Sequence, residues 1–319
     1  MTRWIDHYGL GTFSDHDHTF AGVVAHDLVL EIPANALTDG PATVLGVLDN
    51  WAEARTQLPG LAQSALSGGA PLAELCVRPP VQPRQIFQAG ANYRSHVAEI
   101  IVSGKAGDDN RTDEQLRAAA EKMLDERAAT GSAFLFAGLP SAMCGADDEV
   151  ILIADSTQTD WEAELTVVIG SVTDNVAPDD ALSHVAGYTI ANDISARDLQ
   201  FPAEHRPLGG DWLRAKNRPT FLPVGPFIVP ADVVGDYRDL ELTLDLNGKR
   251  MQQDKAANMI FDVPALVAQA SQITPLQPGD LILTGSPAGN GGKWQRWLRP
   301  GDVLETQISG LSSLRNTCR

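Results

Sequence analysis

The stretch from residue 160 to residue 170, Asp-Trp-Glu-Ala-Glu-Leu-Thr-Val-Val-Ile-Gly, restricts the possible folds of this chain more than any other. Its second half is rich in β-branched residues and it ends at Gly170, which is typical of a strand. Side chains alternate between the two faces of a strand, so Glu162 and Glu164 are expected on one face and the apolar residues on the other. Neighbouring carboxylates repel each other, and either water on a solvated face or a divalent cation has to offset that repulsion.

Short strands separated by turn signals account for most of the chain after residue 79. Residues 240–246 alternate between apolar and polar side chains, and Asn247-Gly248 predicts a type I′ hairpin turn into a further strand. Other expected features are strands over 149–154, 185–190 and 222–229, a buried apolar stretch over 134–144, and a helix over 263–270. The pattern predicts an α+β fold that is mainly β, with a roll or barrel-like large domain.

A small N-terminal α/β domain is predicted for residues 1–78, because prolines at 79, 80 and 83 mark a boundary before the larger domain of residues 79–319. Within it, residues 20–32 predict two strands around a turn, residues 42–58 a helix, and residues 61–66 a second short helix. The run Asp15-His16-Asp17-His18 is interpreted as a solvated loop, since four consecutive residues on a short turn cannot all converge on a metal.

Residues 101–131 are predicted to form a helical insertion in the larger domain. Thr112 and Gln115 fit a capping box, and the apolar residues that follow have helical spacing up to about Thr130. This segment is either a lid over a site or a surface elaboration.

The net charge of −17 argues against binding to nucleic acid or to anionic membranes. The sequence has no apolar run long enough to span a bilayer, and its first residues lack the apolar core of a signal peptide. Its three cysteines are widely scattered, which indicates neither a disulfide framework nor a zinc site. A cytoplasmic location is therefore expected.

Several polar residues are candidates for chemistry on their spacing alone. His96 and Glu99 would share one face of a short helix, either as a hydrogen-bonded general base or as a surface ion pair. Asp193 follows the predicted strand over 185–190, where a third carboxylate can join Glu162 and Glu164.

Three further residues offer hydrogen-bond donors to an anion. Arg197 and Gln200 follow closely after Asp193, although a surface salt bridge between Arg197 and Asp198 is the plainer interpretation. Lys216 supplies a point charge for an anion, or else faces solvent as most lysines do.

Six motifs in order resemble the fumarylacetoacetate hydrolase family over about residues 79–319. They are Asn92-Tyr93-Arg94-Ser95-His96, residues 160–165, residues 187–198, Arg214-Ala215-Lys216, Pro278-Gly279-Asp280 and Thr284-Gly285-Ser286-Pro287. The resemblance implies the mixed β-roll fold of that family for this region. The N-terminal segment resembles the variable small domain that many members carry.

The resemblance also implies the parts of an active site. A divalent metal, usually Mg²⁺ with Mn²⁺ or Ca²⁺ as alternatives, is expected on Glu162, Glu164 and Asp193. His96 and Glu99 are expected to act as the general base on a segment that orders over the substrate. Lys216, Arg197, Gln200 and Thr284 match positions that contact a small 2-keto acid substrate or its enolate. Members usually form homodimers.

The function expected from this resemblance is hydrolytic C–C cleavage of a 2,4-diketo acid of the acylpyruvate or fumarylpyruvate type, as in the catabolism of aromatic compounds. The same chemistry would serve a 2-hydroxyhepta-2,4-diene-1,7-dioate isomerase or decarboxylase, or an oxaloacetate decarboxylase. A non-catalytic metal- or ligand-binding protein on this scaffold is the remaining alternative.

One residue departs from the family pattern. Many relatives carry a lysine shortly before the Pro-Ser-Ala segment, and Gly138 stands at that position here. A positive charge near the site is therefore expected to be missing, which puts the recognition of a second substrate carboxylate in doubt.

Overall fold

The computed structural model describes residues 5–16, 18–104 and 109–319. The first four residues, Asp17 of the acidic run, and residues 105–108 of the predicted insertion lie outside the described residues. The structure confirms the α+β class, and helix and strand contribute in similar proportion around one large mixed sheet.

That sheet has twelve strands, and ten of them follow one another in the order β4-β3-β2-β1-β13-β11-β10-β16-β6-β7. Their bounds are Ala70–Pro71 (β4), Leu28–Glu31 (β3), His18–His26 (β2), Ile5–Asp15 (β1), Leu222–Pro230 (β13), Val185–Asn192 (β11), Ala163–Ile169 (β10), Leu281–Leu283 (β16), Ile86–Gly90 (β6) and Phe134–Gly138 (β7). Two short strands lie off this path, β5 (Cys76–Arg78) on β1 and β8 (Met143–Cys144) on β13.

A second sheet of four strands packs across the middle of the large one. It has the order β15-β14-β17-β18, with bounds Lys249–Lys255 (β15), Glu241–Leu246 (β14), Val303–Ile308 (β17) and Ser312–Thr317 (β18). Its strands contact β10, β11 and β13, and Leu242 and Ile308 share a hydrophobic core with Leu165 and Ile190 of the large sheet. The remaining pair of strands, β9 (Thr159–Asp160) and β12 (Ser195–Ala196), forms a separate two-stranded ladder.

The helices differ greatly in length. The long ones are α2 (Trp51–Gly68), α3 (Arg94–Ser103), α4 (Asp113–Thr130) and α9 (Val263–Ile273). The short ones are α1 (Val44–Asp49), α5 (Pro178–Ala181), α6 (Arg197–Gln200), α7 (Trp212–Lys216), α8 (Ala231–Val234) and α10 (Gly291–Trp294). No helix in the described part of the chain is long and apolar enough to cross a membrane.

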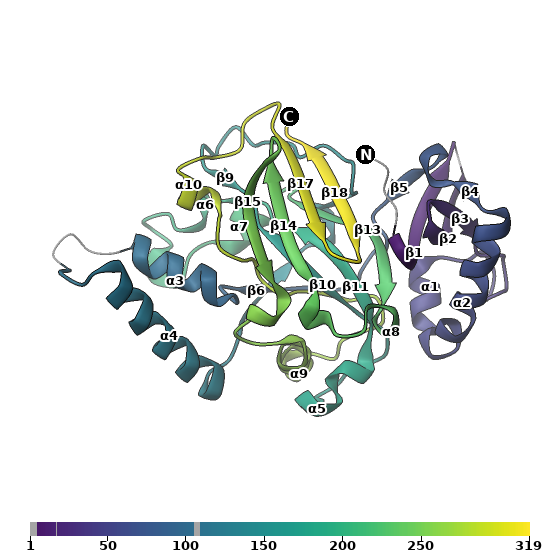
Figure 1. Ribbon diagram of the computed structural model, residues 1–319, viewed down its shortest axis with the longest axis horizontal. Coiled ribbons are helices and arrows are strands. Elements are labelled where there is room, and N and C mark those ends of the chain that lie inside the picture. The colour runs from purple at the N-terminus through teal and green to yellow at the C-terminus, as the bar shows by residue number, and fades with distance from the viewer. Residues whose placement is uncertain (1–4, 17, 105–108) are drawn as a thin grey trace.

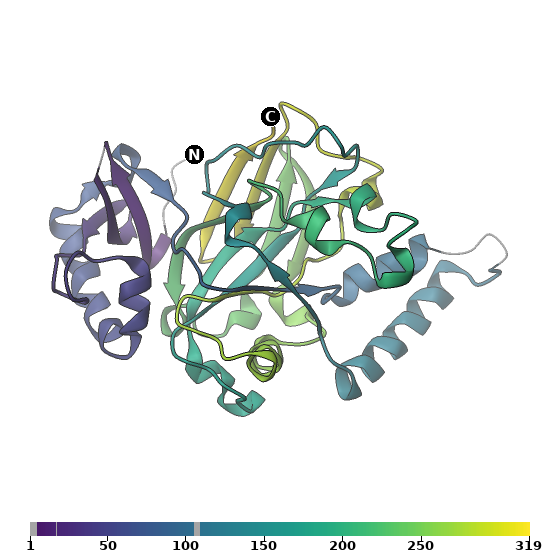
Figure 2. The ribbon, with the colours of Figure 1, turned by 180° about the vertical axis from the view of Figure 1, so that it is seen from behind.

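The N-terminal segment and the α3–α4 pair lie at opposite ends of the molecule (Figures 1 and 2). In the N-terminal segment, α1 and α2 cover one face of β1, β2 and β3. Strand β1 also pairs with β13, with Leu10 opposite Ile228, so the sheet runs on without a break into the larger part of the chain. One hydrophobic core contains Leu10 and Val23 together with Val168 and Leu281. The domain boundary near residue 78 stays a prediction.

Several predicted elements are confirmed. Asn247 and Gly248 have φ angles of 52° and 78°, as a type I′ turn between β14 and β15 requires. The side chain of Thr112 accepts a hydrogen bond from the backbone of Gln115 and the reverse bond is also formed, which completes the capping box of α4.

Other predictions were wrong in detail. The helices expected over 42–58 and 61–66 are α1 and α2, because the chain turns only at Asn50 and then continues through Pro59 to Gly68. The strand expected over 149–154 is an irregular segment with one bridge, from Val150 to Cys318. The apolar stretch at 134–144 is only partly buried, and Phe134 and Leu139 have 48% and 39% of their surface exposed.

Candidate active site

Four segments that are distant in the sequence meet at one edge of the large sheet. Strand β10 begins there at Ala163, and its antiparallel neighbours β11 and β16 end there. Strand β6 is parallel to β16, so it ends at the same edge and leads into α3. The residues just outside these strand ends, at 162, 193, 284 and 92–96, are therefore placed side by side by the register of the sheet.

Three carboxylates come together at this edge. One oxygen each of Glu162, Glu164 and Asp193 lies within 4.8 Å of the other two, and all three side chains are buried. The expectation that Glu162 and Glu164 point to one face while the apolar side chains point to the other agrees with this cluster. Strand β10, however, is buried on both faces, so water on a solvated face does not offset the repulsion.

Lys216 lies among these carboxylates instead of facing solvent. Its Nζ donates to Glu162 Oε2 at 2.7 Å, to Ser195 Oγ at 2.8 Å, and to Asp193 Oδ2. Helix α7 carries this lysine, and Asp211 caps the helix by accepting a bond from the backbone of Arg214. The charges of Asp193 and Glu162 raise the pKa of Lys216 against the effect of its burial, so it is a permanent cation at this site.

Arg197 is the second cation of the site. Its Nε donates to Asp160 Oδ2 at 2.8 Å, and its Nη2 donates to Glu162 Oε1 at 2.5 Å. A weaker bond of 3.3 Å joins its Nη1 to Gln200 Oε1. The surface salt bridge with Asp198 does not form, because Asp198 accepts bonds from Ser156 and Thr157.

The two cations do not neutralise the cluster evenly. Burial opposes ionisation of Glu162, but Arg197 and Lys216 outweigh it and lower the pKa of that carboxyl. Burial, with Asp193 and Glu162 nearby, raises the pKa of Glu164 well above its ordinary value. Burial likewise raises the pKa of Asp193, to about 7, despite the opposing charge of Lys216. Glu164 is thus the carboxylate with the least compensation in the protein itself.

These residues fit a hard divalent cation. Four buried carboxylates, including Asp160, face two cationic side chains, so the cluster has an excess of negative charge. All donors are oxygens, which Mg²⁺ and Mn²⁺ prefer. Gln88 donates a long bond of 3.5 Å to Asp193, and its own Oε1 is buried without a hydrogen-bond partner among the residues that the structure describes. Sequence reasoning missed Gln88, because nothing in its local pattern sets it apart from other strand residues.

His96 is close to this cluster, but Glu99 does not hold it. Burial lowers the pKa of His96 to about 4, and the positive charges of Arg197 and Lys216 add to this effect. Its Nδ1 is buried without a partner among the described residues. Glu99 instead accepts a bond of 3.2 Å from the backbone of Gly289 through Oε1, with Lys293 3.8 Å from Oε2. The hydrogen-bonded pair predicted for this helix is therefore not formed in this conformation.

Thr284, like Glu164 and Glu99, is not among the residues that line the cavity beside the carboxylates. Its hydroxyl donates to the backbone oxygen of Leu165 at 2.9 Å, and it is fully buried. It joins β16 to β10, so its contribution in this structure is to hold the two strand ends together.

Asn92 is a positioning residue that the sequence motif contained but did not explain. Its Nδ2 donates to the backbone oxygens of Phe261 and Thr284 at 2.9 and 2.8 Å, and its Oδ1 accepts from Phe261 N at 2.9 Å. It therefore ties the segment that leads into α3 to the end of β16.

Replacing Asn92 with alanine is expected to lower the free energy of unfolding by about 2–3 kcal/mol, because three buried backbone groups lose their partners. Urea denaturation measures this change. The exposed Asn258 offers a matched control, and its replacement with alanine is expected to cost less than about 0.5 kcal/mol. Equal unfolding midpoints for the two variants would contradict the positioning role.

A cavity of about 290 Å³ opens beside the carboxylates. Its polar lining residues are His96, Glu162, Asp193, Arg197, Gln200, Lys216 and Ser286. Its other lining residues are Ala89, Gly90, Ala91, Ile100, Phe136, Phe201 and Trp212. A lining with residues of both kinds is compatible with a keto acid that has a polar head and a less polar tail.

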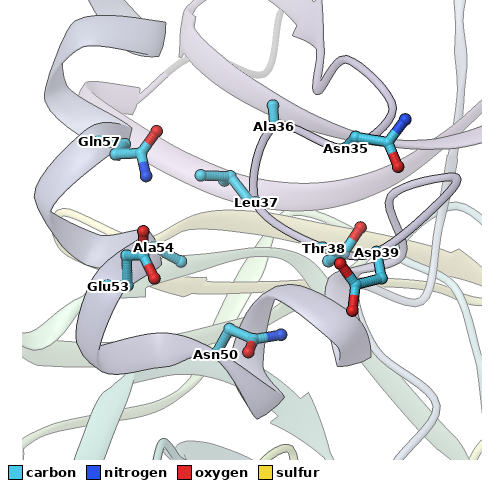
Figure 3. Close-up of a pocket in the computed structure, with 9 residues that line it drawn as sticks. All are labelled: Asn35, Ala36, Leu37, Thr38, Asp39, Asn50, Glu53, Ala54 and Gln57. Carbon is cyan, nitrogen blue, oxygen red and sulfur yellow. The ribbon is translucent and has the colours of Figure 1, made fainter.

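A smaller hollow in the N-terminal segment lies between the loop of residues 35–39 on one side and Asn50 with helix α2 on the other (Figure 3). Asp39 and Glu53 are its charged residues, and none of the predicted site residues lines it. It lacks a cationic side chain among its lining residues, so it offers no obvious place for a keto acid.

Comparisons with known proteins agree with this geometry. Residues 85–319 match the family model described as "Fumarylacetoacetate (FAA) hydrolase C-terminal". The chain is 39% identical over 222 residues to a 2,4-didehydro-3-deoxy-L-rhamnonate hydrolase of Sphingomonas sp. (strain SKA58), covering 69% of this chain and 72% of that protein. It is 33% identical over 263 residues to a mitochondrial oxaloacetate tautomerase of Bos taurus, covering 82% and 72% respectively.

The likeness extends to solved structures along almost the whole chain. The maleylpyruvate hydrolase from Sphingobium sp. SYK-6 superposes with a TM-score of 0.73 at 26% identity, over 97% of this chain and 98% of that chain. The N-terminal segment is therefore included in the shared architecture.

Proposed function

The chain belongs to the fumarylacetoacetate hydrolase family, and from that premise we propose that it is a Mg²⁺-dependent hydrolase that cleaves a C–C bond in 2,4-diketo acids of the acylpyruvate type. The observation that carries the proposal is the buried cluster of Glu162, Glu164 and Asp193 beside a cavity that also contains a neutral histidine. Relatives of this family are named as hydrolases and as tautomerases of keto acids.

The cation would be held by Glu162, Glu164 and Asp193. When bound, it would act as a Lewis acid toward the keto and carboxylate oxygens of a substrate. Its positive charge would also stabilise the electron pair that remains on the pyruvate part when the C–C bond breaks.

Lys216 and Arg197 supply fixed positive charge to the lining of the cavity. Both are already oriented by ion pairs, so neither has to reorganise much before it can bind an anionic head group. Gln200, held by Arg197, adds an amide at the same wall.

His96 is the proposed general base. With a pKa lowered to about 4 it is neutral at neutral pH, so its imidazole can accept a proton from a water molecule that attacks the distal carbonyl. Both residues lie on α3, so Glu99 would become the partner of His96 only after its own side chain leaves Gly289 and Lys293.

The direct test is the loss of the enol absorbance of acetylpyruvate, measured first with Mg²⁺ and then after EDTA. We expect metal-dependent loss with one pyruvate formed for each acetylpyruvate consumed, and we expect EDTA to abolish it. Turnover that is unchanged by EDTA would contradict the metal dependence.

Oxaloacetate tautomerisation is the second candidate, favoured by the tautomerase relative and by the missing His96–Glu99 bond, since moving a proton within a substrate does not require an activated water. Absorbance that relaxes between keto and enol forms of oxaloacetate without release of a new product would identify it.

The assembly and location of the protein are also part of the proposal. By family resemblance it acts as a homodimer on a small-molecule 2-keto acid, and the proposed location, the cytoplasm, rests on its cysteines. Three free cysteines, with Cys144 and Cys318 buried, agree with a reducing compartment.

A further inference from the structure

We infer that the substrate tail is a flat apolar group, such as a phenyl ring, and that it carries no second carboxylate. This inference rests on the proposed function, since it names the acyl group of the diketo acid that the same cavity would accept. It is carried by a group of four aromatic side chains, Phe134, Phe136, Phe201 and Trp212, called here the aromatic wall.

The aromatic wall is one packed unit. The ring of Trp212 lies 4.9 Å from Phe136, 5.0 Å from Phe134 and 5.8 Å from Phe201, measured between centroids, and the pair with Phe201 is edge-on at 87°. Gly90 permits this packing, because a Cβ at that position would lie 2.8 Å from Phe134. Three of the four rings line the cavity.

The aromatic wall begins next to the polar head site. Lys216 Nζ lies 5.5 Å from the centroid of Phe136 and 5.9 Å from that of Trp212. A substrate whose carboxylate end is held beside Lys216 and Arg197 lies next to these rings, which its acyl group can contact. Ile100, half exposed at the mouth, extends the apolar surface.

The charges around the cavity disfavour a second carboxylate. Of the described residues that line it, Arg197 and Lys216 are the cations, and both are engaged by Asp160, Glu162 and Asp193. Gly138 follows Phe136 by two residues, on the same face of β7, where a Cβ would meet Ile86 and Gln88. A tail carboxylate against the rings would be desolvated without a counter-ion.

The experiment compares three substrates that differ only in the tail: acetylpyruvate, benzoylpyruvate and fumarylpyruvate. With Mg²⁺ present, we expect kcat/KM for benzoylpyruvate to exceed that for fumarylpyruvate by about tenfold or more, because the phenyl ring gains aromatic contacts and the carboxylate loses hydration. A preference for fumarylpyruvate would overturn the inference.

Variants locate the effect in the aromatic wall. Trp212→Ala is expected to lower the ratio of kcat/KM for benzoylpyruvate to that for acetylpyruvate by about tenfold. Phe201→Ser changes a side chain with 44% of its surface exposed, and it is expected to lower the same ratio by a smaller factor. It replaces Trp212→Ala as the test variant if the tryptophan variant does not fold. Ile273→Ser, an exposed apolar residue at the end of α9, is the matched control and should leave the ratio unchanged.

Two further readouts separate the possible failures. If none of the three compounds is hydrolysed, the proposed function fails. Calorimetric binding of the same compounds then still decides the tail preference. Tighter binding of fumarylpyruvate than of benzoylpyruvate would overturn the inference. If Trp212→Ala converts a dimer to a monomer in size-exclusion chromatography while the ratio stays unchanged, the wall binds a second copy of the chain and the inference is also overturned.

Discussion

Glu164→Gln is expected to abolish the metal-dependent activity while the protein stays folded. The amide oxygen of glutamine can still accept the 2.6 Å bond from the backbone of Gly285, so the local packing is kept. The glutamine variant lacks the negative charge that would hold the cation. Without the cation the reaction loses a Lewis acid whose contribution corresponds to about 10²–10³-fold in rate. The measurement is kcat/KM with saturating Mg²⁺.

The stability of this variant gives an independent check. The pKa of Glu164 is raised in the folded protein, so the ionised form at neutral pH costs stability when no cation offsets it. The glutamine variant should therefore be at least as stable as the wild type in EDTA. Mg²⁺ at about 100 times its Kd should stabilise the wild type by about 2.7 kcal/mol, and the variant much less.

A matched control comes from Glu305, which pairs with Arg315 on the other sheet. Glu305→Gln should keep both the activity and the thermal shift with Mg²⁺. Full activity of Glu164→Gln with added Mg²⁺ would show that Glu164 is not a ligand.

His96→Ala is expected to lower kcat by about 10²–10⁴-fold and to leave the thermal shift with Mg²⁺ intact, because the imidazole is a base in the proposal and not a ligand. His96→Gln, which fills more of the space, separates the loss of the base from the loss of packing. His184, hydrogen-bonded to Ser171, provides the control variant His184→Ala. Unchanged turnover of both His96 variants would remove the base assignment.

The three carboxylates of the site could be predicted from the alternation of side chains along a strand and from the position of Asp193 after the next strand. The spacing of Glu162 and Glu164 was enough to place both on one side of a strand. Asp193 was expected beside them because it follows a strand, and the register that sets Ala163 opposite Asn192 brings it there. The sequence alone therefore predicts that these three carboxylates lie together.

What the sequence did not provide is the set of contacts made across long separations. Lys216 is fixed by Glu162 and Asp193, 54 and 23 residues away, and its position in the sequence left open whether it binds an anion or faces solvent. Arg197 bonds to Asp160 and Glu162 and not to its neighbour Asp198, because α6 turns Asp198 toward the loop at 156–157. Propensity and spacing carry no information on such partner choice.

The aromatic wall could not be predicted from the sequence either. Phe134 and Phe136 belong to a stretch that reads as core, and Trp212 lies in a loop-rich segment with no periodic pattern. Only the pairing of β7 with β6 and the placement of α7 bring the rings together over the cavity.

The pairing of β1 with β13 has a consequence for how this chain evolves and unfolds. The match to the family model starts at residue 85, yet the strand that continues the sheet of that region, and part of the apolar core under the sheet, come from the first 30 residues. The region that the family model matches is therefore not a complete packed unit without the N-terminal segment. A recombination event that exchanged the N-terminal segment would have to supply a new strand for β13 and a new set of side chains for the shared core, which restricts exchange to partners that already carry both.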